Sequence, residues 1–225
     1  MIIKNILQKN KLLLKKHNIT NFNLDAEILL CFVLFREREY LITHGEKKIS
    51  LFSTIVYSYL INKRIKGFSV ATIIKQKSFY GREFMVNRHV LIPRPETEIM
   101  IDEVLKKITQ EKSKYSIIDI GTGSGCIPIT ISKEITNSNN LFLAVDISRK
   151  ALKIAYKNSI LHNVSKKITF FRGNLLTPIL KKINTLKLSK NPIILTANLP
   201  YLTDEQIKNS PSIQKEPITA LNGGD

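Results

Sequence analysis

From residue 115 onward, four short apolar segments alternate with stretches whose apolar residues recur at helical spacing. Each segment is a nearly continuous apolar run of strand length, bounded by turn-forming residues. Strands of this kind, separated by helices, are typical of a parallel sheet that helices cover on both faces. The sequence therefore predicts a doubly wound α/β fold with strands at residues 115–120, 141–146, 168–171 and 192–197.

The first 75 residues have a different pattern, without strand-like segments. Apolar residues recur at helical spacing in three stretches, and the third, which starts at Leu51, stops at Gly67, a good helix terminator. We expect an N-terminal all-α bundle in residues 1–75 that serves in substrate recognition. Its expected apolar positions are Ile3, Ile6, Leu12, Leu13, Leu24, Ile28, Leu29, Phe32, Val33, Ile55, Leu60 and Ile61.

Residues 76–98 differ from both neighbouring regions. Short β-type runs flank Gly81 and Asn87, which predicts a β-hairpin. Pro93 and Pro95 then make a stiff, non-helical segment, and Glu96 opens a helix that extends to about residue 107. We interpret this region as a hairpin and proline-rich linker that leads into the sheet domain, residues 99–225.

The first strand of the sheet runs directly into a glycine-rich loop. Glycines permit a tight turn and let backbone N–H groups approach a ligand closely at the start of a helix. The spacing is not the dinucleotide-binding pattern, because Cys126 stands where the third glycine would be, and no Gly-Lys-Ser/Thr phosphate loop follows. The candidate binding residues of this loop are Asp119, Gly121, Thr122, Gly123 and Gly125.

Polar residues also follow the next two strands. Asp146 ends the second strand, about 20 residues beyond the glycine loop, where a carboxylate can accept both hydroxyls of a ribose. Asn174 follows the third strand, where its amide could contact an adenine. The alternative for Asp146 is a cap on the helix that begins near Ser148, and for Asn174 a simple turn. Three ligand-type strand ends together favour a nucleotide-like ligand.

The fourth strand is followed at once by Asn198, Leu199, Pro200 and Tyr201. Irregular chain at the carboxyl end of a parallel strand is where α/β proteins bind their ligands. A turn in which Pro200 breaks the strand and Tyr201 packs is the alternative. The tetrapeptide alone does not decide between the two.

Charge and cysteine content add little to this. The net charge of +17 favours an acidic partner, such as nucleic acid or the ribosome, but the lysines are spread along the chain, as a general composition bias would spread them. The two cysteines are far apart and belong to no paired motif, so we expect no disulfide framework. Its absence indicates a reducing compartment. The four histidines show no metal-ligand spacing, so we predict no metal site. No apolar run is long enough to span a membrane.

In combination, these motifs resemble a known family. The order D-x-G-x-G-x-G, then an acidic residue after the second strand, then N-x-P-Y after the fourth is similar to that of class I S-adenosylmethionine-dependent methyltransferases. The segments "LIPRPETE" (residues 91–98) and "EPITAL" (residues 216–221) resemble the family that methylates the glutamine of peptide chain release factors. This resemblance extends from the helical region to the last residue.

The resemblance implies transfer of a methyl group from S-adenosylmethionine to the N5 side-chain nitrogen of the glutamine in the Gly-Gly-Gln motif of release factors. It implies a cytoplasmic enzyme whose partners are release factors, and a monomer when full length. The implied catalytic residues are Asn198, Leu199, Pro200 and Tyr201. The implied cofactor-binding residues are Asp119, Gly121, Thr122, Gly123, Gly125, Asp146, Asn174, Asn198 and Arg94.

Two positions depart from the family pattern. Leu199 replaces the first proline of the usual Asn-Pro-Pro-Tyr, and position 174 is usually acidic but is Asn here. Asn-Leu-Pro-Tyr also resembles the motif of rRNA adenine dimethyltransferases, so methylation of adenine N6 in rRNA or DNA is an alternative function. A non-catalytic nucleotide-binding module is a further alternative, against which the intact Asn-x-Pro-Tyr argues.

The family fold continues beyond the fourth strand with a helix and three further strands. Only 28 residues follow Ala197 in this chain. We therefore expect a sheet that is incomplete at its C-terminal side, an exposed apolar edge at residues 192–197, and a chain that is a fragment with weak solubility and activity.

Overall fold

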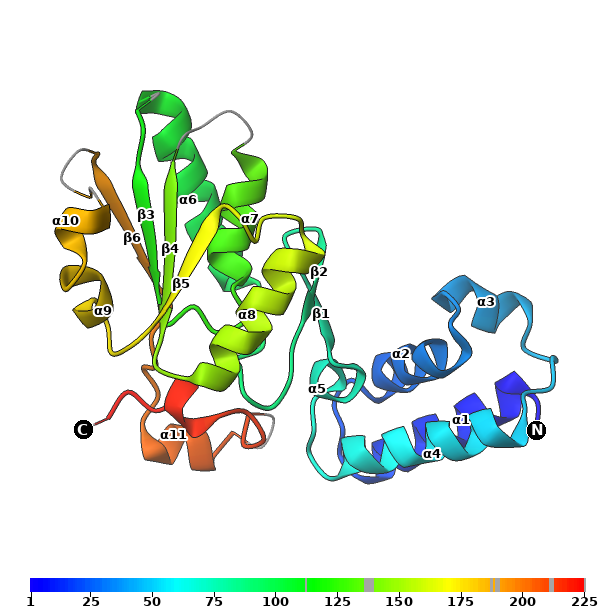
Figure 1. Ribbon diagram of the computed structural model, residues 1–225. Coiled ribbons are helices and arrows are strands. Elements are labelled where there is room, and N and C mark those ends of the chain that lie inside the picture. The colour runs from blue at the N-terminus through cyan, green and yellow to red at the C-terminus, as the bar shows by residue number, and fades with distance from the viewer. Residues whose placement is uncertain (112, 136–139, 187, 189–190, 211–212, 225) are drawn as a thin grey trace. The chain divides into compact units, whose positions relative to one another are not determined.

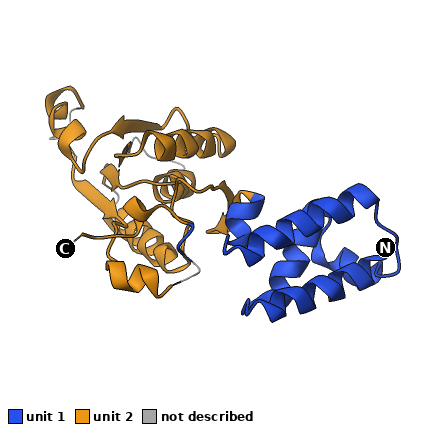
Figure 2. Cartoon of the chain, turned by 90° about the horizontal axis from the view of Figure 1, so that it is seen from below, with its two compact units in different colours: residues 1–74, 211–215 blue, residues 75–210, 216–225 orange. Residues whose placement is uncertain are grey.

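The computed structural model describes residues 1–111, 113–135, 140–186, 188, 191–210 and 213–224. The chain forms two compact units, which Figure 2 colours separately. The first consists of residues 1–74 and 211–215, and the second of residues 75–210 and 216–225. The hairpin region thus belongs to the second compact unit, while the domain limits expected from the sequence remain a proposal.

The first unit is a bundle of helices around its own apolar core (Figure 1). The three long helices are those that the sequence predicts: α1 (Ile3–Lys16), α2 (Phe22–Leu34) and α4 (Leu51–Ile65). The short helices α3 (Arg38–Thr43) and α5 (Val70–Ile74) were not predicted. Within the described residues, no helix is both long and apolar enough to cross a membrane.

Some apolar positions of this unit face outward, contrary to the expected pattern. Ile55 is 60% exposed, whereas Tyr57 on the same helix is fully buried. Residues two positions apart in a helix differ by about 200° around its axis, so burial of Tyr57 places Ile55 on the outer face. Leu12, Leu24 and Phe32 are also exposed.

The second unit begins with the predicted hairpin. Strands β1 (Gln76–Phe79) and β2 (Arg82–Met85) pair antiparallel around Gly81, while Asn87 lies beyond the second strand. Helix α6 starts at Glu96 as predicted, but extends to Glu111 rather than to about residue 107.

The sheet of the second unit has four parallel strands in the order β5-β4-β3-β6, as Figure 1 shows. The strands are β3 (Ser116–Ile120), β4 (Leu141–Asp146), β5 (Ile168–Arg172) and β6 (Ile193–Ala197). Helix α7 (Cys126–Glu134) connects β3 to β4, and α8 (Arg149–Leu161) connects β4 to β5. The predicted α/β fold with a parallel sheet is confirmed.

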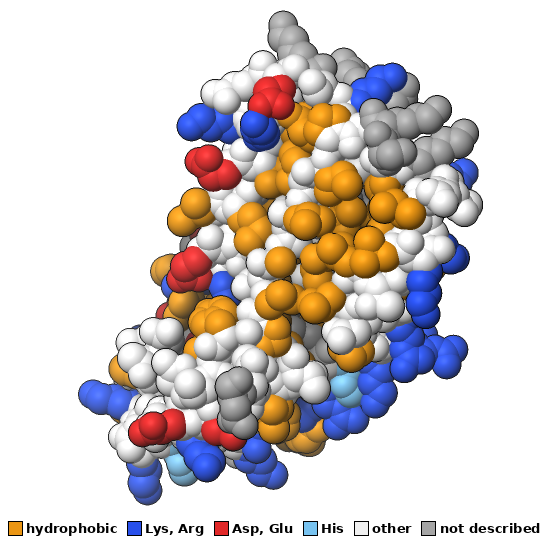
Figure 3. All heavy atoms as spheres, turned by 90° about the vertical axis from the view of Figure 1, so that its left-hand side faces the viewer, with side chains coloured by type: hydrophobic (Ala, Val, Ile, Leu, Met, Phe, Trp, Pro, Cys, Tyr) orange, Lys and Arg blue, Asp and Glu red, His pale blue; other side chains and the backbone are white. Residues whose placement is uncertain are grey.

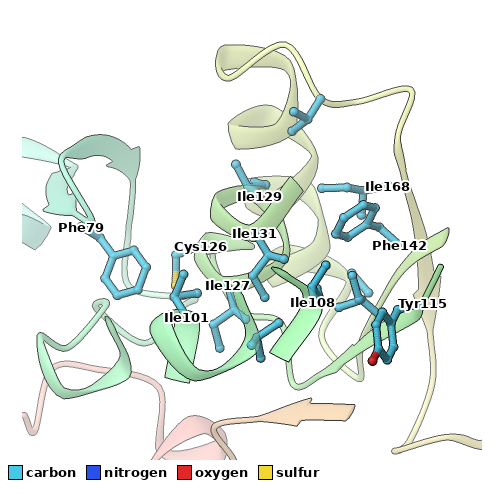
Figure 4. Packing of buried hydrophobic residues seen from close by; sticks show 14 of the residues in the cluster. Phe79, Ile101, Ile108, Tyr115, Cys126, Ile127, Ile129, Ile131, Phe142 and Ile168 are labelled. Atoms are coloured by element: carbon cyan, nitrogen blue, oxygen red, sulfur yellow. The ribbon is translucent and has the colours of Figure 1, made fainter. Parts of the chain in front are cut away.

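Alternate residues of the central strands pack on opposite faces of the sheet. Ile117 and Phe142 belong to a core that includes residues of α6, α7 and the hairpin (Figure 4). Ile118 and Leu143 belong to a smaller core on the other face, which contains Ile179 of α9 (Thr177–Leu180). Because both faces of the central strands β3 and β4 pack against these two cores, the loops at the carboxyl ends of these strands start from fixed positions.

In the described sheet, β6 is an edge strand. Its Ile193 and Leu195 are 49% and 53% exposed. Figure 3 shows a broad hydrophobic area on the left-hand side of Figure 1, where β6 and α10 (Ile183–Leu186) lie. The apolar edge expected from the sequence is therefore present in the described sheet.

Two short elements follow β6. Helix α11 (Asp204–Lys208) begins with a capping box, in which Thr203 and Gln206 bond each other's backbone N–H groups. A 3-10 turn, η2 (Ile218–Ala220), then brings the chain back beside Leu202, which pairs with Asn222. The chain beyond η2 thus lies next to the loop that follows β6.

Candidate active site

A cavity of about 490 Å³ lies in the second unit at the carboxyl ends of the sheet strands. Its walls come from residues 89–97, the loops after β3, β4, β5 and β6, and the segment around η2. The structure brings eight of the predicted site residues to this cavity: Gly121, Thr122, Gly123, Asp146, Asn174, Asn198, Leu199 and Pro200.

Four predicted site residues do not line the cavity. Asp119 is completely buried at the end of β3, and Gly125 packs against α8. Tyr201 is 75% exposed, and the next residue, Leu202, forms backbone hydrogen bonds with residues 221 and 223. Arg94 donates to the carboxylate of Glu216 at 2.6 Å. The predicted catalytic role of Tyr201 and the cofactor role of Arg94 have no support from this placement.

The glycine loop has the backbone conformation that requires glycine. Gly121, Gly123 and Gly125 have φ angles of +70°, +55° and +79°, in the left-handed region that other residues rarely adopt. A Cβ atom on Gly125 would also lie 3.0 Å from both Ala155 and Ile129. Gly125 therefore permits close helix packing, whereas Gly121 and Gly123 leave room at the cavity.

Asp146 closes this loop from the neighbouring strand. One carboxylate oxygen accepts the Gly123 N–H and the other accepts the Ser148 N–H, both at 2.8 Å. Ser148 itself caps α8 by accepting the Ala151 N–H, so the cap considered for Asp146 belongs to Ser148. A carboxylate has about four acceptor positions. Two therefore remain on Asp146 for the hydroxyls of a ligand.

Asp119 lies below the loop with half of its carboxylate unpaired. The Thr196 hydroxyl donates to Oδ1 at 2.8 Å, whereas Oδ2 has no hydrogen-bond partner among the described residues, and neither has the Thr122 hydroxyl. Burial raises the pKa of Asp119 to about 7, although the hydroxyls of Thr122 and Thr196 lower it. A buried acceptor without a partner is costly, and a cationic ligand group nearby would relieve that cost.

The loop after β6 is held by segments that are distant in sequence. Asn198 Nδ2 lies 3.3 Å from the hydroxyl of Thr97, which is buried in the first turn of α6. On the other side, Gly223 approaches so closely that a Cβ atom would lie 3.1 Å from the Pro200 oxygen. Leu199 packs over Gly121, where an added Cβ atom would lie 3.1 Å from its Cδ2. The two loops at the cavity thus contact each other directly.

Sequence reasoning missed three residues that support this site. Thr97 and Glu216 lie in the two segments noted for their resemblance, but no role was predicted for either side chain. The amide of Asn158, fully buried in α8, accepts the Met85 N–H and donates to the Met85 and Ser124 carbonyl oxygens. It thereby ties the hairpin to the glycine loop, and no pattern around Asn158 indicates this.

The charges at the cavity suit a cation rather than a phosphate. Among the described residues that line it, Asp146 is the one acidic side chain, and none is Lys or Arg. A phosphate ligand would need a cation that this wall lacks, despite the net charge of +17. S-adenosylmethionine carries a sulfonium, an ammonium, a carboxylate and a ribose diol, and its net positive charge and its diol fit the residues present.

Comparison with known proteins agrees with this geometry. Residues 5–74 match the family described as the PrmC N-terminal domain. The chain is 35% identical to the release factor glutamine methyltransferase of Bacillus anthracis over 204 residues, which is 89% of this chain and 69% of that protein. The chain belongs to the release factor glutamine methyltransferase family. The enzyme of this name from Dictyoglomus turgidum is 37% identical over 94% of this chain and 71% of its own length.

The chain is also similar to part of a longer protein. The bifunctional methyltransferase of Rickettsia bellii is 33% identical over 94% of this chain, which spans only 42% of that protein. Residues 95–196 also match the family described as ribosomal protein L11 methyltransferase (PrmA). That match covers the glycine loop and most of β6, so it extends the likeness to the methyltransferase sheet.

Proposed function

We propose that this protein transfers a methyl group from S-adenosylmethionine to the side-chain amide nitrogen of the glutamine in the Gly-Gly-Gln motif of peptide chain release factors. Family membership supports the reaction, and the cavity at the strand ends supports the cofactor. The single observation that carries the proposal is the position of Asn198, which faces the same cavity as the glycine loop and Asp146. We further propose a cytoplasmic protein that is a monomer when full length.

The bound cofactor would supply an electrophilic methyl group on a positively charged sulfur. Asp146 would accept the ribose hydroxyls, and Asn174 would lie beside the adenine. Thr122, which lines the cavity, and the buried Asp119 carboxylate, whose pKa the Thr122 hydroxyl lowers, would lie on the side of the ammonium end. The glycine loop leaves the space that the amino-acid part of the cofactor requires.

The acceptor nitrogen of a glutamine amide is a poor nucleophile because its lone pair is delocalised into the carbonyl. Most of the rate enhancement must therefore come from orientation. Asn198 Oδ1 would accept one N–H of the substrate amide, and Nδ2 would donate to the substrate carbonyl. The backbone carbonyl of Leu199 would accept the second N–H. A leucine provides this oxygen as well as the proline of other family members does.

The reaction needs no strong base. A bond forms from the glutamine nitrogen to the methyl carbon as the carbon–sulfur bond breaks, and the electron pair of that bond stays on sulfur. The nitrogen then loses one proton to water. Asn198 and the Leu199 carbonyl hold the amide during this exchange, and the apolar wall of the cavity favours the loss of the positive charge.

Mass spectrometry of a release factor tests the proposal. The protein should add one methyl group to the motif's glutamine when S-adenosylmethionine is present, and add none to a release factor with asparagine at that position. Ribosomal RNA in the same reaction tests the adenine alternative, which the similarity to release factor enzymes no longer favours. A new methyl group on the RNA alone, or on neither substrate, would contradict the proposed function. The net charge of +17 would then deserve a test as an RNA-binding surface.

A further inference from the structure

The side chain of Asn198 has a partner outside its own loop. Its Nδ2 atom lies 3.3 Å from Thr97 Oγ1 on α6, and the two residues are 101 positions apart in the sequence. Both line the cavity, and Thr97 is only 8% exposed. Because little water reaches the Thr97 hydroxyl, this contact bears directly on how the amide of Asn198 is turned.

Thr97 is itself held firmly. Its backbone N–H donates to the Arg94 carbonyl at 3.0 Å, in the proline-flanked segment that precedes α6. Glu216, whose side chain is 4% exposed, accepts the Ile92 N–H at 3.1 Å and the Arg94 guanidinium at 2.6 Å. A buried carboxylate thus fixes the segment that carries Thr97, and the hydroxyl reaches Asn198 from a rigid support.

An amide side chain can present either its oxygen or its nitrogen to a substrate, since the two ends have nearly the same shape. Only the orientation with Oδ1 toward the substrate NH₂ is productive, because a nitrogen there would place two donors against each other. One Nδ2 hydrogen directed at Thr97 leaves Oδ1 and the second hydrogen for the acceptor amide.

We propose that Thr97 is a positioning residue that holds the Asn198 amide in place, with Nδ2 at the Thr97 hydroxyl and Oδ1 toward the acceptor. This inference rests on the proposed methyl transfer to a planar amide. Thr97 takes no part in the reaction itself. Among the described residues, its hydroxyl makes the one polar contact that links α6 to Asn198.

Thr97→Val removes the hydroxyl and keeps the shape, so it tests the contact with little effect on packing. We expect kcat to fall by about ten-fold or more, because the amide loses its fixed orientation, while the Kd for S-adenosylmethionine stays unchanged. Thr97→Ser restores the hydroxyl and should restore kcat. Thr109→Val on the same helix is the matched control, because Thr109 is exposed and bonds only Leu105 of its own helix among the described residues.

A second measurement separates positioning from a general structural effect. In an Asn198→Ala background, Thr97→Val should cause no further loss of kcat, since the group that it orients is gone. In ¹⁵N spectra of the protein without substrate, the side-chain amide of Asn198 should exchange its hydrogens faster in Thr97→Val than in wild type, and Thr97→Ser should resemble wild type.

The outcomes distinguish this inference from the proposed function. An inactive wild-type protein would contradict the proposed function, while the amide exchange measurement would still test the contact. Full kcat in Thr97→Val, additive losses in the double variant, or unchanged exchange at Asn198 would each overturn the role of Thr97.

Discussion

The two loops that meet at the cavity are held in place in different ways. The glycine loop after β3 is held by its own three left-handed glycines and by residues of the next strand and helix, Asp146 and Asn158. The loop after β6 depends on distant segments, with Thr97 on one side and residues 221–223 on the other. The loop proposed to bind the cofactor is therefore a local motif, whereas the loop proposed to bind the acceptor is assembled by the tertiary fold.

This difference matches the tasks proposed for the two loops. A cofactor that many proteins share can be bound by a short motif on a buried strand pair. Orientation of an acceptor amide requires support from several directions, because small displacements cost much of the rate. Substitutions in the first loop should therefore change cofactor affinity, and those in the second should change turnover.

The largest expected effect is that of Asn198→Ala on turnover. Loss of the amide removes an oriented acceptor and donor, so kcat should fall by about a hundred-fold or more. The Kd for S-adenosylmethionine should change little, because the glycine loop and Asp146 remain. Single-turnover rates and calorimetry measure the two quantities. Equal losses in cofactor affinity and in rate would contradict the proposed roles, in which the glycine loop binds the cofactor and the loop after β6 orients the acceptor.

Asp146→Ala should have the opposite profile. Bonds from hydroxyls to a charged group are worth about 1.5–3 kcal/mol each, so the loss of two such bonds should raise the Kd by roughly a hundred-fold or more. Asp146→Asn keeps one acceptor oxygen and serves as the conservative control. Thermal unfolding of both variants checks whether the lost backbone bonds of Gly123 and Ser148 disturb the fold. An unchanged affinity in calorimetry would rule out the ribose contact.

A smaller effect concerns pH, through Asp119. Its pKa of about 7 lies above the usual 3.8, so between these values the folded chain binds a proton that the unfolded chain has released. The stability that this proton contributes is present at acid pH and is lost as the pH rises toward 7. A cationic cofactor group favours the ionised carboxylate, so affinity should increase as the pH rises through this range.

Calorimetry across this pH range measures the effect, and Asp119→Asn should remove the part of the pH dependence of affinity and stability that Asp119 causes. Asp146 is the neighbouring charge, and it contributes to the raised pKa of Asp119. A cofactor affinity that stays level in wild type would mean that no cation binds near Asp119.

The sequence predicted the locally determined parts of this structure well. The sequence predicted all four strands of the parallel sheet, because buried parallel strands are short apolar runs that end at glycine, asparagine or proline. The glycine loop and Asp146 were placed at one site, because parallel strands end at the same edge of a sheet. Ser148, rather than Asp146, caps α8, and both assignments fit the sequence equally well.

The parts that tertiary contacts determine could not be predicted. Nothing near Thr97 indicates that its hydroxyl meets Asn198, and the contact of Glu216 with Ile92 and Arg94 joins residues more than 100 positions apart. Tyr201 was expected at the cavity but is 75% exposed, next to a residue that pairs with the distant Asn222. The helical and strand periodicities of a sequence reflect local structure. They carry no information about which residues far apart in the sequence contact each other.

The smallest expected effect is that of Leu199→Pro, which restores the residue usual in this family. If only the Leu199 carbonyl oxygen acts, the exchange keeps that atom, and the Leu199 N–H takes part in no backbone hydrogen bond among those of the described residues. Proline would stiffen the loop and remove the Leu199 Cδ2 atom, which lies over Gly121. The kcat of Leu199→Pro should thus stay within about three-fold of wild type. A large loss would show that the leucine side chain, through its contact with the glycine loop, couples cofactor and acceptor in this protein.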